Sequence, residues 1–300
     1  MRIIRIKSAE KEVQTAALTD QEEVYALPFD TTTKLFAEAV SQGKTTLELV
    51  EELIQNQEPV STNPEELELL VPTEVTEVWA SGVTYQKSRE ARNYEATEGK
   101  LDAATFYDKV YEAVRPEIFF KATGQRVVGQ NTDVYLRSDS NWQIPEPELG
   151  LVLNRKGEII GYTIGNDMSC RDIEGENPLY LPQAKIWKNS CSIGPAIRLA
   201  ETVKNPYDFQ LQCRIFRDGE KVFEGEAYVN QLKRKLEELV EYLVKDNDVF
   251  DGMILLTGTC VVPPNEFTLQ DGDQIEIEIP GIGILRNPVK QPASKTAASS

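Results

Sequence analysis

A hairpin that carries carboxylates on both arms is the feature that most constrains this chain. Residues 149–164 form two apolar, β-branched runs separated by Asn-Arg-Lys-Gly, which predicts two strands joined by a tight turn. Side chains two residues apart leave the same face of a strand, so Glu146 and Glu148 point the same way. If the return strand keeps its pairing, it brings Asp167 to the level of Glu146.

Three converging carboxylates repel one another unless a cation or protons lie between them. Oxygen ligands of this kind suit a hard divalent ion such as Mg²⁺, Mn²⁺ or Ca²⁺. A solvated acidic hairpin is the alternative, because 49 of the 300 residues are acidic and chance pairs are common. Residues 165–172 mix Gly, Asn, Asp and Arg directly after an apolar strand, and this favours the metal site.

The chain contains no histidine. This excludes Ser-His-Asp triads, Cys-His dyads and His-ligated zinc, so acid–base chemistry falls to Glu, Asp, Lys, Tyr or water. Its four cysteines are scattered singly and form no C-x-x-C pair, so we interpret them as reduced packing residues. A nucleophilic cysteine would need an activating base, and the usual one is missing.

A formal net charge of −17 argues against nucleic acid or an anionic membrane as a partner. No run approaches the ~18 apolar residues of a spanning helix. The first six residues alternate as an amphipathic strand and do not have the pattern of a signal peptide. Together with the reduced cysteines, these features predict a cytoplasmic protein.

The predicted fold class is α+β. Residues 1–72 form a small N-terminal α/β domain without a catalytic pattern, which we interpret as a packing or oligomer-supporting unit. Residues 73–288 form a larger β-rich domain that carries the candidate site. The last twelve residues, 289–300, are rich in Pro, Ser, Lys and Ala, which predicts a disordered tail.

Several motifs occur in a fixed order along the chain: Pro116 to Lys121, Glu146-x-Glu148, Gly165 to Asp172, Lys185, Ile193-Gly194-Pro195 and Leu256 to Thr259. In this order they resemble the fumarylacetoacetate hydrolase family. The resemblance implies that Glu146, Glu148 and Asp167 hold Mg²⁺ or Mn²⁺ and that Lys185 lies beside the substrate. It also implies a β-rich C-terminal fold of that family and a homo-oligomer, either a dimer or a tetramer.

One position departs from the family pattern. Ser88 stands where the hydrolytic members carry the histidine that activates water for carbon–carbon cleavage, and a lone hydroxyl is no base at neutral pH. Tyr85, Ser88 and Arg89 are instead predicted to contact the substrate, since Arg offers a carboxylate two parallel donors. An exposed helix face is an equally good interpretation for Arg89 and the preferred one for Arg92.

The branch of the family that lacks this histidine but keeps Arg-Pro-Glu-Ile-Phe-Phe-Lys and Leu-Pro-Gln-Ala-Lys is similar to this chain. That similarity implies dehydration of a 2-keto-3-deoxy sugar acid, from 2-keto-3-deoxy-D-arabinonate to 2,5-dioxopentanoate. Lys185, with its pKa lowered by a neighbouring cation, is the candidate base, and a partly buried Glu117 is the candidate acid. Thr257, Gly258 and Thr259 are candidates to hold the substrate carboxylate.

Two alternatives stay open. The first is a C–C hydrolase of acylpyruvates or fumarylpyruvate, or a 2-oxo acid decarboxylase, working at the same metal. The second is a non-catalytic, metal-dependent protein that binds a small 2-oxo acid.

Overall fold

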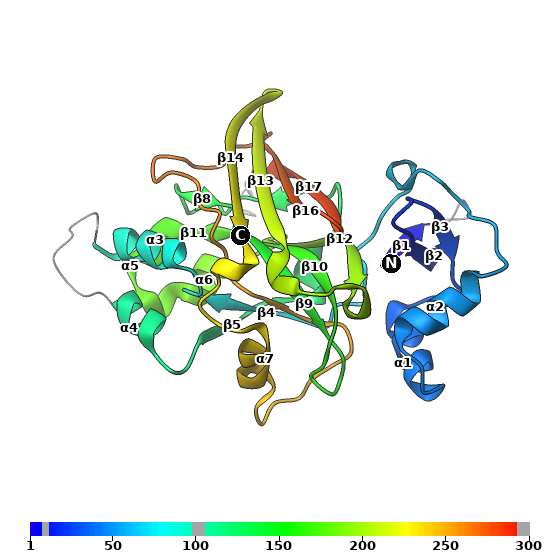
Figure 1. Ribbon diagram of the computed structural model, residues 1–300. Coiled ribbons are helices and arrows are strands. Elements are labelled where there is room, and N and C mark those ends of the chain that lie inside the picture. Colours follow the sequence, from blue (N-terminus) through cyan, green and yellow to red (C-terminus); the bar gives the residue numbers. More distant parts are fainter. Residues whose placement is uncertain (8–11, 98–105, 293–300) are drawn as a thin grey trace, which may run out of the picture.

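The computed structural model describes residues 1–7, 12–97 and 106–292, and its frame is a ten-stranded sheet (Figure 1). The spatial order is β3-β2-β1-β12-β10-β9-β15-β4-β5, with β6 beside β12. Its strands are β1 (Arg2–Lys7), β2 (Val13–Leu18), β3 (Val24–Ala26), β4 (Glu77–Gly82), β5 (Glu117–Thr123), β6 (Val127–Val128), β9 (Pro147–Leu153), β10 (Ile159–Asp167), β12 (Cys191–Leu199) and β15 (Met253–Leu256).

A second, five-stranded sheet has the order β14-β13-β16-β17-β7, and a two-stranded one pairs β11 with β8. Their strands are β7 (Val134–Tyr135), β8 (Gln143–Ile144), β11 (Ser169–Cys170), β13 (Gln210–Arg217), β14 (Glu220–Tyr228), β16 (Gln274–Ile279) and β17 (Gly283–Lys290). The long β13–β14 hairpin projects from the body of the molecule (Figure 1).

The helices are short and lie around the sheets (Figure 1). They are α1 (Thr32–Ser41), α2 (Thr46–Ile54), α3 (Gln86–Thr97), α4 (Phe106–Glu112), α5 (Arg171–Glu176), α6 (Leu181–Lys185) and α7 (Leu236–Val244). Single 3₁₀ turns are η1 (Pro64–Glu66), η2 (Gly124–Arg126), η3 (Pro178–Tyr180), η4 (Ala200–Thr202), η5 (Pro206–Asp208) and η6 (Val229–Gln231). Thr45 begins α2 through a capping box with Glu48, which satisfies N–H groups at the helix start.

Strand β9 is buried on both faces, and its alternation explains how the layers are joined. Leu149, Leu151 and Leu153 enter a core that β13, β16 and α7 complete. Val152 points to the opposite face, into a second core that includes Leu35 of α1. The carboxylate-bearing strand is therefore held between two apolar layers.

The predicted hairpin is confirmed. β9 and β10 pair antiparallel with Gly165 opposite Glu148, and Asp167 N–H donates to the Glu146 carbonyl at 2.9 Å. Directly opposed residues of antiparallel strands place their side chains on the same face. Because Gly165 has no side chain, the Glu148 carboxylate meets no opposing group from that strand position.

The N-terminal strands join the main sheet. β1 pairs antiparallel with β12, with Arg2 opposite Arg198 and Ile3 opposite Ile197. The α+β class is confirmed, whereas the division at residue 72 stays a prediction. The predicted start of the tail at residue 289 is corrected, because β17 pairs Val289 with Val134. Residues 293–300 lie outside the described residues, and within the described ones no helix is long and apolar enough to cross a membrane.

Candidate metal centre and active site

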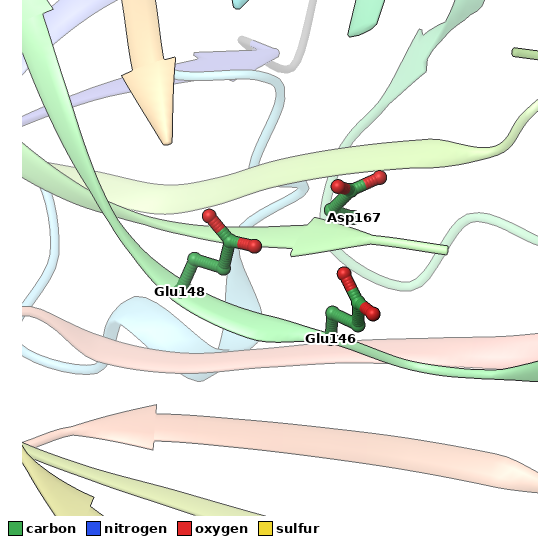
Figure 2. Close-up of side chains that lie close together, drawn as sticks. All are labelled: Glu146, Glu148 and Asp167. Atoms are coloured by element: carbon green, nitrogen blue, oxygen red, sulfur yellow. The ribbon is translucent and has the colours of Figure 1, made fainter. Parts of the chain in front are cut away.

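Three buried carboxylates come together at the open end of the β9–β10 hairpin (Figure 2). Glu146 directly precedes β9, Glu148 lies within it, and Asp167 ends β10. One oxygen of each lies within 4.8 Å of the others. Their exposed fractions are 5%, 1% and 1%, respectively. Such close, desolvated negative charges are unfavourable unless positive charge or protons compensate them.

The protein's own charges and pKa shifts reduce this repulsion only in part. Burial, and then the charges of Asp167 and Glu146, raise the pKa of Glu148 well above its usual range. Burial also acts to raise the pKa of Glu146, but Lys185, Arg92 and Arg171 outweigh it and lower that pKa. A divalent ion bound between the oxygens would supply the missing charge, and all-oxygen ligands suit Mg²⁺ or Mn²⁺. These residues therefore fit a hard divalent cation.

Lys185, the last residue of α6, is fully buried against this centre. Its Nζ lies 2.5 Å from Glu146 Oε2 and 3.2 Å from Asp167 Oδ2. Burial acts to lower the pKa of Lys185, but Asp167, Glu146 and Glu174 together raise it above its ordinary value. The predicted fall in the pKa of Lys185 depends on a neighbouring cation and stays a prediction. The positive charge of a bound cation would act together with burial and Arg92 to favour the neutral amine.

Glu117 begins β5 and lies across from Gly82 of β4. Its Oε2 is buried and has no hydrogen-bond partner among the described residues. Burial raises the pKa of Glu117, with Arg92 and Lys185 acting against it and Glu174 and Glu146 acting with it. The side chain thus keeps its proton to higher pH than an exposed glutamate does, which is the property of a general acid.

Ser88 and Tyr85 fix the start of α3. The Ser88 hydroxyl donates to the Tyr85 carbonyl at 2.8 Å and accepts from the Tyr85 N–H at 3.1 Å. Tyr85 is 2% exposed, and burial, then Cys260 and Glu148, raise its pKa well above the usual value. Ser88 also lines the pocket over the carboxylates. Its hydroxyl is committed to the backbone, so it is not placed as a base.

Two arginines of α3 point to different neighbours, and only Arg92 departs from the interpretation preferred for it from the sequence. Arg89 lies 3.7 Å from Asp108 and stacks on the Tyr111 ring at 4.8 Å, which directs it towards α4. Arg92, predicted to be exposed, is 5% exposed, lines the pocket and forms an ion pair with Glu174. The helical period could have identified it, because residues four apart share a helix face and Arg92 follows Ser88 by four.

Residues 257–259 follow β15, and three of their hydrogen-bond donors bind other groups of the protein. Gly258 N–H donates to Glu148 Oε2 at 2.6 Å, and the Thr257 hydroxyl donates to the Leu149 carbonyl at 3.0 Å. The Thr259 hydroxyl donates to the Val261 carbonyl at 3.3 Å, and Thr259 lines the pocket. The motif therefore holds a carboxylate of the protein in place, a task that the sequence did not indicate.

One pocket brings most of the candidate residues together. Its lining includes Glu146, Glu148, Asp167, Lys185, Ser88 and Thr259 of the predicted set. It also includes Arg92 and Arg171, which sequence reasoning did not select, and Gly82, on which the Glu117 carboxyl rests.

The fold and this buried carboxylate centre define a class of protein whose site fits a divalent metal ion. Similarity to known proteins then gives the family. A family model described as the fumarylacetoacetate (FAA) hydrolase C-terminal matches residues 88–290. The chain therefore belongs to the fumarylacetoacetate hydrolase family.

Individual members of this family are similar to the chain over most of its length. The chain is 48% identical over 226 residues to 2-dehydro-3-deoxy-D-arabinonate dehydratase of Saccharolobus solfataricus, covering 75% of this chain and 76% of that protein. It is also 48% identical over 219 residues to the probable 2-keto-3-deoxyxylonate dehydratase of Haloferax volcanii, covering 73% and 74%. A solved 2-keto-3-deoxy-D-arabinonate dehydratase, complexed with magnesium and 2,5-dioxopentanoate, matches with a TM-score of 0.81 and 37% identity, covering 98% of this chain and 100% of that chain.

Proposed function

We propose that this protein is a Mg²⁺-dependent hydro-lyase that converts 2-keto-3-deoxy-D-arabinonate to 2,5-dioxopentanoate. The observation that carries the proposal is the buried Glu146, Glu148 and Asp167 centre with Lys185 against it, in a chain without histidine. The dehydratase relatives, each 48% identical, support the reaction type and the substrate class. Four buried free cysteines support a reducing compartment such as the cytoplasm.

Glu146, Glu148 and Asp167 would hold the cation, with Mn²⁺ as the other candidate. When bound, such an ion stabilises the negative charge that develops on a 2-oxo acid as a neighbouring C–H bond breaks. Arg92 and Arg171 line the same pocket and add positive charge for an anionic substrate. The positive charges that line the pocket therefore suit a small anionic 2-oxo acid.

Two side chains would move the protons. Lys185 takes the C3 proton, and Glu117 protonates the departing C4 hydroxyl, so a C–H and a C–O bond break and water leaves. The unsaturated 2-oxo acid that remains loses a proton from C5 and regains one at C3, which moves the double bond between C4 and C5. This enol takes a proton at C4 and loses its hydroxyl proton, so that C5 becomes the aldehyde of 2,5-dioxopentanoate. No water nucleophile is required, so the reaction does not need the missing histidine.

The engaged Ser88 hydroxyl counts against the hydrolase alternative. Cleavage of a carbon–carbon bond by water needs a base to activate that water, and Ser88 already hydrogen-bonds the Tyr85 backbone. Decarboxylation of a 2-oxo acid and binding without turnover remain as outcomes of the experiment.

A turnover screen tests the proposal. Several 2-keto-3-deoxy acids are incubated with protein and Mg²⁺, and we expect 2,5-dioxopentanoate from the pentonate without cleavage of its carbon chain. EDTA should abolish turnover, and so should Glu146→Gln in protein that remains folded. Pyruvate release would support the hydrolase, carbon dioxide the decarboxylase, and saturable binding without product the non-catalytic alternative. Full activity after EDTA treatment would contradict the metal centre.

A further inference from the structure

Lys121 is a fully buried cation to which the proposed chemistry gives no task. It lies in β5 at an irregularity of the pairing with β4, where Ala122 is opposite Val78 and Phe120 is opposite Trp79. Lys121 is thus the extra residue of a β-bulge. Bulges are frequent beside active sites because they re-aim a side chain out of the regular alternation.

The Lys121 ammonium has partners in three places. It lies 2.5 Å from Asp167 Oδ1, donates to the Met168 carbonyl at 2.9 Å and donates to the Lys185 carbonyl. The Trp187 ring lies 5.3 Å away and covers it. The ammonium thus forms one ion pair and two hydrogen bonds, and these contacts join the end of β10 to the end of α6.

We propose that Lys121 is a positioning residue that fixes the Asp167 carboxylate and the Lys185 backbone relative to each other. The inference rests on the proposed function, which makes Asp167 a metal ligand and Lys185 the base. Lys121 and Glu117 both lie in β5. In this proposal, one strand therefore carries the acid and also the residue that positions the ligand Asp167 and the base Lys185. Partners of metal ligands typically matter in this way for metal affinity.

Positioning and simple charge compensation predict opposite results. Lys121 contacts Asp167 Oδ1 while Lys185 lies 3.2 Å from Oδ2, so a cation bound at Asp167 would face two ammonium groups. If Lys121 only supplied charge, its removal would strengthen cation binding, because one repelling charge is gone. If it holds the carboxylate in the geometry for binding, its removal weakens cation binding.

The test measures Mn²⁺ binding by electron paramagnetic resonance, a readout that needs no turnover. We expect Lys121→Met to weaken Mn²⁺ binding by about 10- to 100-fold and to lower kcat to a similar extent. Lys121→Arg should stay impaired, because a planar guanidinium keeps the charge but cannot meet the same three acceptors. Lys188→Met, which removes an exposed lysine three residues beyond Lys185, is the matched control and should behave as wild type.

Unchanged or tighter Mn²⁺ binding in folded Lys121→Met would overturn the proposal, as would full recovery in Lys121→Arg. If Lys121→Met does not fold, the same measurements are made on Lys121→Gln, which keeps N–H donors. Failure of both variants to fold would also contradict it, by assigning Lys121 to the fold itself. Wild-type protein that binds Mn²⁺ but dehydrates no 2-keto-3-deoxy acid would refute only the proposed reaction.

Discussion

At the residue scale, the pKa values of Lys185 and Glu117 are both raised, for different reasons. The carboxylates around Lys185 outweigh its burial and stabilise its charged form, whereas burial of Glu117 disfavours its charged form. The shift of Glu117 favours the form that the proposed acid needs, whereas the proposed base Lys185 needs positive charge beside it to lose its proton. If Lys185 is the base, we expect metal binding and base activation to be coupled.

Proton exchange in D₂O separates the two roles. Lys185→Met should stop both dehydration and exchange of the C3 proton, because it removes the proposed base. Glu117→Gln should stop dehydration but leave exchange, since the cation and the base remain. General acids and bases typically contribute about 10²- to 10⁴-fold each. Mass analysis of substrate recovered from D₂O makes the measurement, and undiminished exchange in folded Lys185→Met would remove Lys185 from this role.

The sequence predicted those site residues whose spacing is local. Glu146 and Glu148 share a face because strands alternate, and the turn before Glu158 brings Asp167 back beside them. The preferred interpretation of Arg92 as exposed was wrong: its spacing from Ser88 was a local signal, but its partner Glu174 comes from α5, more than eighty residues away in the chain. Lys121 was named only as the end of the motif that begins at Pro116, since no local pattern reveals the bulge that redirects it.

At the element scale, the pairing of β4 with β5 sets the position of the acid. Gly82 lies opposite Glu117, and a Cβ added at Gly82 would lie 2.3 Å from Glu117 Oε2. The carboxyl therefore occupies the space that any other residue at position 82 would fill. Because the atom in the way is the far end of a flexible side chain, a methyl group there displaces Glu117 and leaves the strands paired.

Gly82→Ala should therefore act on catalysis and leave the fold intact. Misplacing a catalytic group by about 1 Å can cost about 10²-fold in rate, and we expect kcat to fall by that order. Exchange of the C3 proton should persist, since Lys185 comes from a different element. Kinetics and circular dichroism check both points, with Gly219→Asn in an open turn as control. A folded Gly82→Ala with wild-type kcat would show that Glu117 is not the acid.

At the scale of the whole molecule, residues 1–72 share both sheet and core with the rest of the chain. The sheet continues from β1 into β12, and Ile3 belongs to the same apolar cluster as Ile193 and Ile197. In Figure 1 the N-terminal helices α1 and α2 lie to one side of the body. The sequence predicted a separate unit because its helices and strands are locally complete. It could not reveal a strand pairing between residues nearly two hundred positions apart.

This shared core predicts a single unfolding transition, which two probes can test. The three tryptophans, Trp79, Trp142 and Trp187, all follow residue 72, so their fluorescence reports only the larger part, whereas far-UV circular dichroism reports the whole chain. We expect the same midpoint from both. Ile3→Ala should lower both midpoints together, because emptying a fully buried isoleucine site costs about 2–5 kcal/mol.

The matched control is Val60→Ala, which shortens a side chain that is 56% exposed in the same N-terminal part. Its effect should stay within about 0.5 kcal/mol, as is usual for surface substitutions. The decisive comparison is the tryptophan signal of Ile3→Ala, because that residue lies in a part of the chain without tryptophan. A fluorescence midpoint that stays at the wild-type value while the dichroism signal develops an earlier step would mean that residues 1–72 unfold alone. A joint shift would instead mean that the strand carrying Ile3 stabilises the sheet on which the carboxylate centre is built.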